Sequence, residues 1–277
     1  KALEYDLLAL KIREKVLGKE HPNYVNSLDN LAVNYHKLGD YNKALEYNLL
    51  ALKIKEKVLG KEHPRYALSI GNLALTYSNL GEYNEALDYN LLALEIYGKI
   101  VGKEHPSYAL SLNNIAIIYS SLGDYNKALG YNLLALEIRE KAVGKEHPDY
   151  AWSLNNIGLN YMDLNNYNKA VEYNLLALKI REKVFGKEHP DYALSIGNLA
   201  VSYLNLGDYN KALEYNLLAL KIREKVFGKE HPDYALSLNN IGVNYTNLHN
   251  YNKALEYNLL ALKIREKVFG KEHRAYA

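Results

Sequence analysis

The sequence predicts an all-α solenoid, a fold in which one helical unit is copied along the chain. Two observations predict it: a fixed repeat period, and two stretches of helical apolar spacing in each period. The motif Gly-Lys-Glu-His recurs every 42 residues, and its histidines are His21, His63, His105, His147, His189, His231 and His273. A period of this size is typical of stacked repeats, which bury their core against neighbouring units rather than in one round domain.

The period divides the 277 residues into three parts. A leading half-repeat covers residues 1–21, six 42-residue repeats cover 22–273, and a trailing stub covers 274–277. We interpret them as a single solenoid domain. The sequence opens in mid-repeat, on KALEYDLLALKIREKV, which is a partial copy of the repeat and not a signal peptide. We therefore expect the chain to be a piece of a longer array, with any targeting signal outside it.

The first half of each repeat predicts a helix, called helix A here. In the first repeat it runs from Pro22 to Leu38, because proline is favoured in the first turn of a helix. Helical spacing gives it an apolar side for the core, formed by Leu28, Leu31, Ala32 and Tyr35. A second side of the same helix carries Asn26, Asn30 and Val33.

The second half of each repeat predicts helix B, from Tyr41 to about Leu59 in the first repeat. Asp40 is a suitable N-cap. The glycine before it is expected to end helix A in the left-handed conformation, as is Gly18 after the first helix. The candidate inner positions of helix B are Ala44, Leu45, Leu52 and Val58.

Two repeats lack the glycine between helix A and helix B. Asn165 and His249 stand there instead. Asparagine tolerates a positive φ reasonably well, and histidine tolerates it less well. Since four other repeats use glycine at this turn, we predict a positive φ at His249.

Composition argues against several functional classes. Lys and Arg number 34 against 32 Asp and Glu, so the balance of charge gives no general argument for a nucleic acid or a membrane partner. Lys53, Lys55, Lys57 and Lys61 are interleaved with glutamates and are interpreted as a solvated edge. No apolar run approaches the roughly 18 residues of a membrane span. The absence of cysteine fits a reducing compartment, so we expect a cytoplasmic protein.

The sequence offers no catalytic or metal-binding constellation. One histidine per repeat cannot converge with its equivalents, because a zinc ion needs three or four ligands at about 2 Å. The histidines are therefore interpreted as structural turn residues. Gly-Lys is followed by Glu, which does not match a phosphate-binding loop. We expect no enzyme activity, no cofactor and no metal.

The repeat resembles the tetratricopeptide (TPR) family. The residues that carry the resemblance are Asn72-Leu73-Ala74, Tyr77, Leu80-Gly81-Glu82-Tyr83, Ala86-Leu87 and Ala93. The usual TPR period is about 34 residues; the longer form, closing in Gly-Lys-x-His-Pro, resembles kinesin light chains and their bacterial relatives. The resemblance implies a right-handed superhelix of antiparallel helix pairs, a concave groove lined by the A helices, and no enzyme activity.

Two departures from the family stand out. Helix B has an asparagine where the family often has an aromatic residue, at Asn48, Asn90, Asn132, Asn174, Asn216 and Asn258. These amides either are solvated or bond a neighbouring backbone. The second departure concerns two sets of groove positions, equivalent to Asp29 and Val33, which hold no cation. A clamp for a C-terminal carboxylate is therefore not expected.

Once the resemblance assigns the concave face, helical geometry places three rows of residues on it. The amide row is Asn30, Asn72, Asn114, Asn156, Asn198 and Asn240. The first apolar row is Leu68, Leu110, Trp152, Leu194 and Leu236. The second apolar row is Leu75, Ile117, Leu159, Val201 and Val243.

An apolar strip edged by amides suits an extended peptide, because amides bond its backbone while the strip accepts its side chains. The alternative is that the amides bond an adjacent helix and the leucines pack together. For the amide row alone we favour this structural role, and for the groove as a whole we favour binding.

The sequence thus predicts a non-enzymatic scaffold that binds an extended peptide or a partner domain in the groove. The alternative is a structural or self-assembling rod. Apolar residues at the two ends have no following or preceding repeat: Leu3, Leu7 and Leu10 in the first helix, and Leu255, Leu259 and Leu262 in the last. Two unlike exposed faces would allow head-to-tail self-association.

Overall fold

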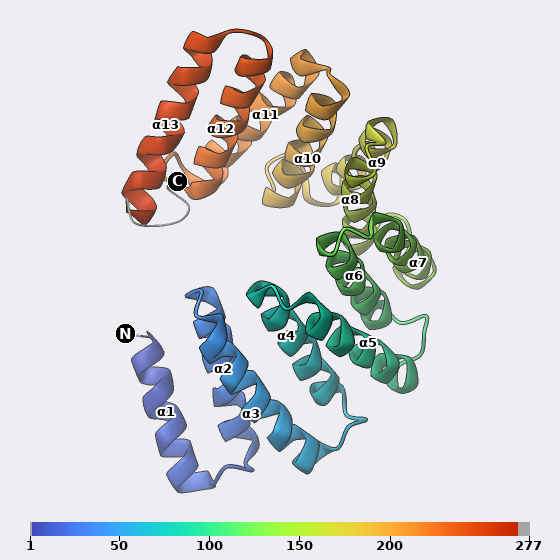
Figure 1. Cartoon of the computed structure of the whole chain (residues 1–277), viewed down its shortest axis with the longest axis vertical. Coiled ribbons are helices and arrows are strands. Elements are labelled where there is room, and N and C mark those ends of the chain that lie inside the picture. Colours follow the sequence, from blue (N-terminus) through green and yellow to red (C-terminus); the bar gives the residue numbers. More distant parts are fainter. Residues whose placement is uncertain (1, 271–277) are drawn as a thin grey trace. The chain divides into compact units, whose positions relative to one another are not determined.

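A computed structural model describes residues 2–270, which hold thirteen α-helices and no strand (Figure 1). The helices are α1 (Ala2–Leu17), α2 (Pro22–Lys37), α3 (Tyr41–Leu59), α4 (Pro64–Leu80), α5 (Tyr83–Ile100), α6 (Pro106–Ser121), α7 (Tyr125–Val143), α8 (Pro148–Asp163), α9 (Tyr167–Phe185), α10 (Pro190–Leu206), α11 (Tyr209–Phe227), α12 (Pro232–Asn247) and α13 (Tyr251–Phe269). The predicted all-α solenoid is confirmed, and even-numbered helices are A helices. His273 and the stub 274–277 lie outside the described residues.

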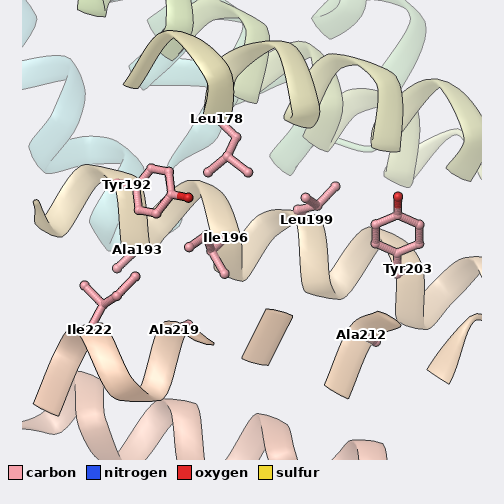
Figure 2. Close-up of a cluster of buried hydrophobic side chains, with 9 residues drawn as sticks. All are labelled: Leu178, Tyr192, Ala193, Ile196, Leu199, Tyr203, Ala212, Ala219 and Ile222. Atoms are coloured by element: carbon pink, nitrogen blue, oxygen red, sulfur yellow. The ribbon is translucent and has the colours of Figure 1, made fainter. Parts of the chain in front are cut away.

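The chain divides into two compact units, residues 1–142 and 143–277. Within each unit, helices that follow one another in sequence pack side by side, joined by short turns (Figure 1). Figure 2 shows the resulting core in the C-terminal unit, where α10 lies between α9 and α11. Ile196 of α10 has no exposed surface, and Leu178 of α9 and Ile222 of α11 approach it from opposite sides. Within the units, the A helices α2, α4, α6, α10 and α12 are each buried by two B helices.

The predicted sides of the first A helix are confirmed. Leu28, Leu31, Ala32 and Tyr35 are buried, whereas Asn26, Asn30 and Val33 are exposed. For helix B, Ala44 and Leu52 are buried and Leu45 is half-buried, but the prediction for Val58 is wrong. Its side chain is 44% exposed, because it lies in the last turn of α3, past the buried stretch that ends at Lys55.

The histidine of each Gly-Lys-Glu-His turn caps the A helix that follows. His63 is in the extended conformation, and its Nδ1 accepts the backbone N–H of Arg65 at 3.1 Å. The same geometry recurs at His21, His105, His147, His189 and His231. A cap satisfies one of the backbone donors that a helix leaves unpaired at its start. This is the structural role expected from the sequence.

The two kinds of glycine turn differ in conformation. Gly81, between α4 and α5, is left-handed as predicted, with φ 81° and ψ 5°. Gly60, at the end of α3, has a similar φ of 81° but an extended ψ of 165°, so the predicted left-handed stop is wrong for this type of turn. That backbone region is open to glycine almost alone. It lets the chain leave helix B directly toward the next histidine cap.

The positive φ predicted at His249 is confirmed at 59°, and Asn165 has 57°. Each side chain meets a tyrosine two residues later. Asn165 Oδ1 accepts the hydroxyl of Tyr167 at 2.7 Å, and His249 Nδ1 lies 3.0 Å from the hydroxyl of Tyr251.

Replacing His249 by glycine should stabilise the protein by about 0.5–1 kcal/mol, because glycine adopts this φ without steric strain. Asn165→Gly is the matched control and should gain less, since asparagine already tolerates the conformation. Urea unfolding followed by circular dichroism measures both. An equal gain at both turns, or none at His249, would contradict the argument from strain.

Candidate functional site

The two predicted apolar rows lie on the solvent-facing side of the A helices. Most of their residues are exposed: Leu68, Leu110, Leu194 and Leu236 in the first row, and Leu75, Ile117, Leu159 and Val243 in the second. Trp152 and Val201 are half-buried. The contrast within one helix is sharp, because Leu75 is 54% exposed and Leu73, two residues earlier, is fully buried. We call the three rows together the A-helix face.

The amide row lies between these leucines. Asn30 is exposed, and the other five are half-buried: Asn72, Asn114, Asn156, Asn198 and Asn240. Within the described residues, none of the six side-chain amides makes a hydrogen bond; at Asn156 the Nδ2 group is itself shielded from solvent. The hydrogen bonds to an adjacent helix that we favoured for this row are therefore not present in the described part of the chain. Apart from Asn156 Nδ2, the amides remain available to a ligand.

A cavity of about 210 Å³ opens on the A-helix face of the N-terminal unit. It is lined by residues of α4, α5 and α6. Six of the predicted site residues line it: Leu68, Asn72, Leu75, Leu110, Asn114 and Ile117. From α5 the cavity is lined by Asn90, Ala93 and Tyr97, and burial raises the pKa of the Tyr97 phenol.

The tetratricopeptide repeat model matches the chain in six overlapping segments, residues 1–57, 39–99, 66–141, 109–183, 149–225 and 192–267. The chain belongs to the tetratricopeptide repeat family. A search of curated proteins returned no match.

Solved TPR structures of similar architecture include a putative kinesin light chain from Podosopora anserina with nearly identical TPR-like repeats. It is 28% identical, and the match covers 74% of this chain and 97% of that one, with a TM-score of 0.63. BtubC (BKLC) from P. vanneervenii is 21% identical over 99% and 95% of the two chains, with a TM-score of 0.66. A Rap protein complexed with competence and sporulation factor is 17% identical over 96% and 86%, with a TM-score of 0.57. The likeness to BtubC and Rap concerns the fold.

Neither a metal centre nor a membrane span emerges from residues 2–270. No three His, Asp or Glu side chains gather where they could hold an ion. None of the helices described is both long and apolar enough to cross a bilayer.

The asparagines of the TPR B helices are buried and bond side chains of the A helices, which neither of our alternatives included. Asn48 Nδ2 donates to Thr76 Oγ1 at 2.9 Å, and Asn174 Nδ2 donates to Ser202 Oγ at 2.9 Å. Asn90 differs, since its Nδ2 donates to the backbone oxygen of Ala86 in its own helix. At Asn48, Asn174 and Asn216, helix B is thereby tied to the A helix of the following repeat. Asn258, in α13, is exposed.

Two residues equivalent to Asp29, counted as groove positions from the sequence, are instead part of this buried network. Asn113 donates to Asn132 Oδ1 at 2.6 Å, and Asn155 donates to Asn174 Oδ1 at 2.9 Å. Both side chains are almost fully buried. They connect an A helix to the B helix of the same repeat and face away from solvent.

The interpretation of Lys55 as part of a solvated edge is wrong. Its side chain is buried, and its Nζ donates to Asp29 at 2.7 Å and to Ser69 Oγ at 2.6 Å. In later repeats an arginine takes this place: Arg181 donates to Ser195 Oγ and Arg223 donates to Ser237 Oγ, both at 2.8 Å.

Each of these two guanidinium groups also donates to a backbone oxygen of the next A helix, that of Asp191 for Arg181 and that of Asp233 for Arg223. Burial lowers the pKa of both guanidinium groups, and the nearby Asp191 and Asp233 carboxylates oppose this shift. The sequence signal that could have identified the role is a serine 14 residues after each cation, at Ser69, Ser195 and Ser237.

Replacing Arg223 by methionine should destabilise the protein by about 2–3 kcal/mol, because it removes charge-assisted hydrogen bonds and leaves a buried serine hydroxyl and carbonyl unpaired. The matched control is Lys225→Met in the same turn. The Lys225 side chain is 66% exposed and pairs with Glu188, so its loss should cost only about 0.5 kcal/mol. Chemical denaturation of both variants makes the comparison, and equal losses would refute the structural role of Arg223.

Proposed function

We propose that this TPR protein is a non-enzymatic interaction scaffold that holds an extended peptide, or an extended segment of a partner domain, along its A-helix face. The observation that carries the proposal is the amide row without hydrogen bonds, set between two rows of apolar side chains, most of which are exposed. We propose no cofactor, and neither a nucleic acid nor a membrane as partner.

The chemistry of the A-helix face matches that of an extended peptide. Each asparagine side chain offers a donor and an acceptor, and the backbone of an extended peptide has both groups unpaired. An exposed leucine or isoleucine stands on either side of the amide, as Leu68 and Leu75 do beside Asn72. These apolar side chains would bury those of the ligand, and burial of apolar area is the main source of affinity.

The solved structures support a binding role in general terms. The Rap structure contains a TPR-like fold in complex with competence and sporulation factor. At 17% identity it does not define the ligand of this chain. It supports the narrower point that a helical array of this type serves as a platform for a partner.

Selection from a random peptide library should yield peptides that bind the A-helix face of the C-terminal unit. The variant Asn156→Ala with Leu194→Ala removes one amide and one leucine and should weaken their binding at least tenfold, equal to about 1.4 kcal/mol. Titration followed by Trp152 fluorescence measures it, since Trp152 lies in the first apolar row.

The control for this experiment is Leu217→Ala with Leu218→Ala on α11. These leucines are 39% and 40% exposed but belong to a B helix. Their replacement should leave the affinity unchanged. Selected peptides that bind the Asn156 and Leu194 variant as tightly as the original chain would exclude this face as the site.

A second function, self-assembly, is favoured by two exposed apolar faces. In α13, Leu255 and Leu259 are 60% and 54% exposed, as the sequence predicted. In α1 the prediction was wrong: Leu3, Leu7 and Leu10 pack against α2 and α3. The exposed residues are instead Tyr5, Leu8, Ile12 and Val16 on the opposite side of the helix. Two different faces that bind each other propagate a linear assembly.

If the chain assembles in this way, its sedimentation coefficient should rise with concentration. Replacing Leu255 and Leu259 by glutamate should abolish the rise, because charged side chains oppose burial of the α13 face. The same replacements at Leu217 and Leu218 are the control and should not. A monomer at every concentration would reject self-assembly and leave the binding proposal standing.

A further inference from the structure

The cavity in the N-terminal unit lies where the buried amide network is incomplete. In the regular repeats, the helix B asparagine has side-chain partners on neighbouring A helices. Asn174 has two, because it donates to Ser202 Oγ and accepts from Asn155 Nδ2. Asn48 donates to Thr76, and Asn216 donates to Asn244. These bonds join a helix B to the A helices beside it.

Asn90 lacks both of these partners, because the two equivalent residues on the neighbouring A helices have no polar side chain. The residue equivalent to Asn155 is Gly71, which has no side chain, and the residue equivalent to Ser202 is Ile118, which has no polar atom. Asn90 turns its Nδ2 to the Ala86 carbonyl at 2.9 Å. Its side chain is 97% buried and lines the cavity, and its Oδ1 accepts no hydrogen bond from any described residue.

The second repeat also lacks the buried cation that other repeats have near this position. Tyr97 stands where other repeats have a buried lysine or arginine, such as Lys55 or Arg223. It lines the cavity together with Asn90 and Ile118. As a result, none of the residues that line the cavity is charged. The lining is uncharged and mostly apolar, and Asn90 Oδ1 is an acceptor in it that has no partner among the described residues.

We propose that this cavity is a binding pocket for a ring-sized apolar group that carries one hydrogen-bond donor, which is received by Asn90 Oδ1. The volume of about 210 Å³ exceeds the roughly 150 Å³ of an apolar cavity that accepts benzene. The absence of charged lining residues favours a neutral ligand over an ion. A phenol meets these requirements, since it combines an aromatic ring with one O–H.

Such a group has two sources, the side chain of a tyrosine in a peptide or a free phenolic molecule. The first deepens the proposed function, because Asn72 and Asn114 of the amide row stand at the cavity wall and could bond the same peptide. The pocket itself can be tested without a peptide. An experiment can therefore reject the pocket without rejecting peptide binding, and the reverse.

The direct test is titration of the whole chain with p-cresol and with toluene, which differ by one hydroxyl, followed by NMR. We expect p-cresol to bind about fivefold more tightly, the effect of a net hydrogen bond of about 1 kcal/mol. Asn90→Leu should bring the two affinities close together by removing the acceptor. Equal binding of both probes to the original chain, or no binding of either, would overturn the proposal.

Gly71→Asn tests the location of the pocket. A Cβ built at Gly71 meets no atom within 4 Å, so the new amide has room to donate to Asn90, as Asn155 does to Asn174. It would fill the cavity, and p-cresol binding should fall at least tenfold. Gly197→Asn places the same residue at the equivalent position of another repeat, where the nearest atom is Arg223 Nη2 at 3.6 Å. This control should bind p-cresol normally. Unchanged binding by the folded Gly71 variant would overturn the proposal.

The two sources are separated with library-selected peptides that contain tyrosine. If p-cresol displaces them and a Tyr→Phe change weakens them about fivefold, the pocket is part of the peptide site. If p-cresol binds and displaces none of them, the pocket serves a free phenolic molecule. Both results support the pocket. Only the second shows that the pocket is not part of the peptide site.

Discussion

Burial of A helices between two B helices of the same unit is the constraint on which the rest of the structure depends. Ile70 and Leu73 of α4 are fully buried, but the side chains that cover them come from α3 and α5. Close approach requires small residues, and helix B supplies Ala86 and Ala93, which have almost no exposed surface. Because each repeat depends on its neighbours in this way, the same side chains must recur in the same register. That requirement accounts for the strict period of the sequence.

Polar groups inside this packing fix the register of one repeat against the next. Apolar contacts alone would tolerate a shift along the helix axis, whereas a buried amide or cation without its partner costs about 1–3 kcal/mol. The bonds of Asn48 to Thr76 and of Arg223 to Ser237 each join one repeat to the next, and they lie at different positions along helix B. Buried polar pairs of this kind add specificity more than stability, and in an array they would set the spacing of the groove rows as well.

The sequence was sufficient to predict the helices, the positive φ at His249 and the sides of helix A, because these follow from local rules of spacing and turn chemistry. It was not sufficient to distinguish Lys55, which is buried, from Lys53, which is exposed. Both look like surface lysines until the neighbouring helix brings Asp29 and Ser69 to one of them. The exposure of Leu75 followed from helical geometry, but the cavity beside it did not. A cavity depends on the combined volumes of side chains from three helices.

The second repeat differs from the others at Gly71, Asn90 and Tyr97, and these differences bear on function. At Asn90 both side-chain partners are missing, although the residue as a whole is 97% buried. A leucine there, packed against Ile118, would avoid an unpaired acceptor, and an asparagine at Gly71 would satisfy it. Instead the acceptor, the missing side chain and the uncharged Tyr97 occur together around one opening on the A-helix face. Asn90 Oδ1 has no hydrogen-bond partner among the described residues and is not among the atoms shut off from solvent, so a donor that enters the opening could pair with it in a largely apolar surrounding, where a hydrogen bond is electrostatically stronger than in water.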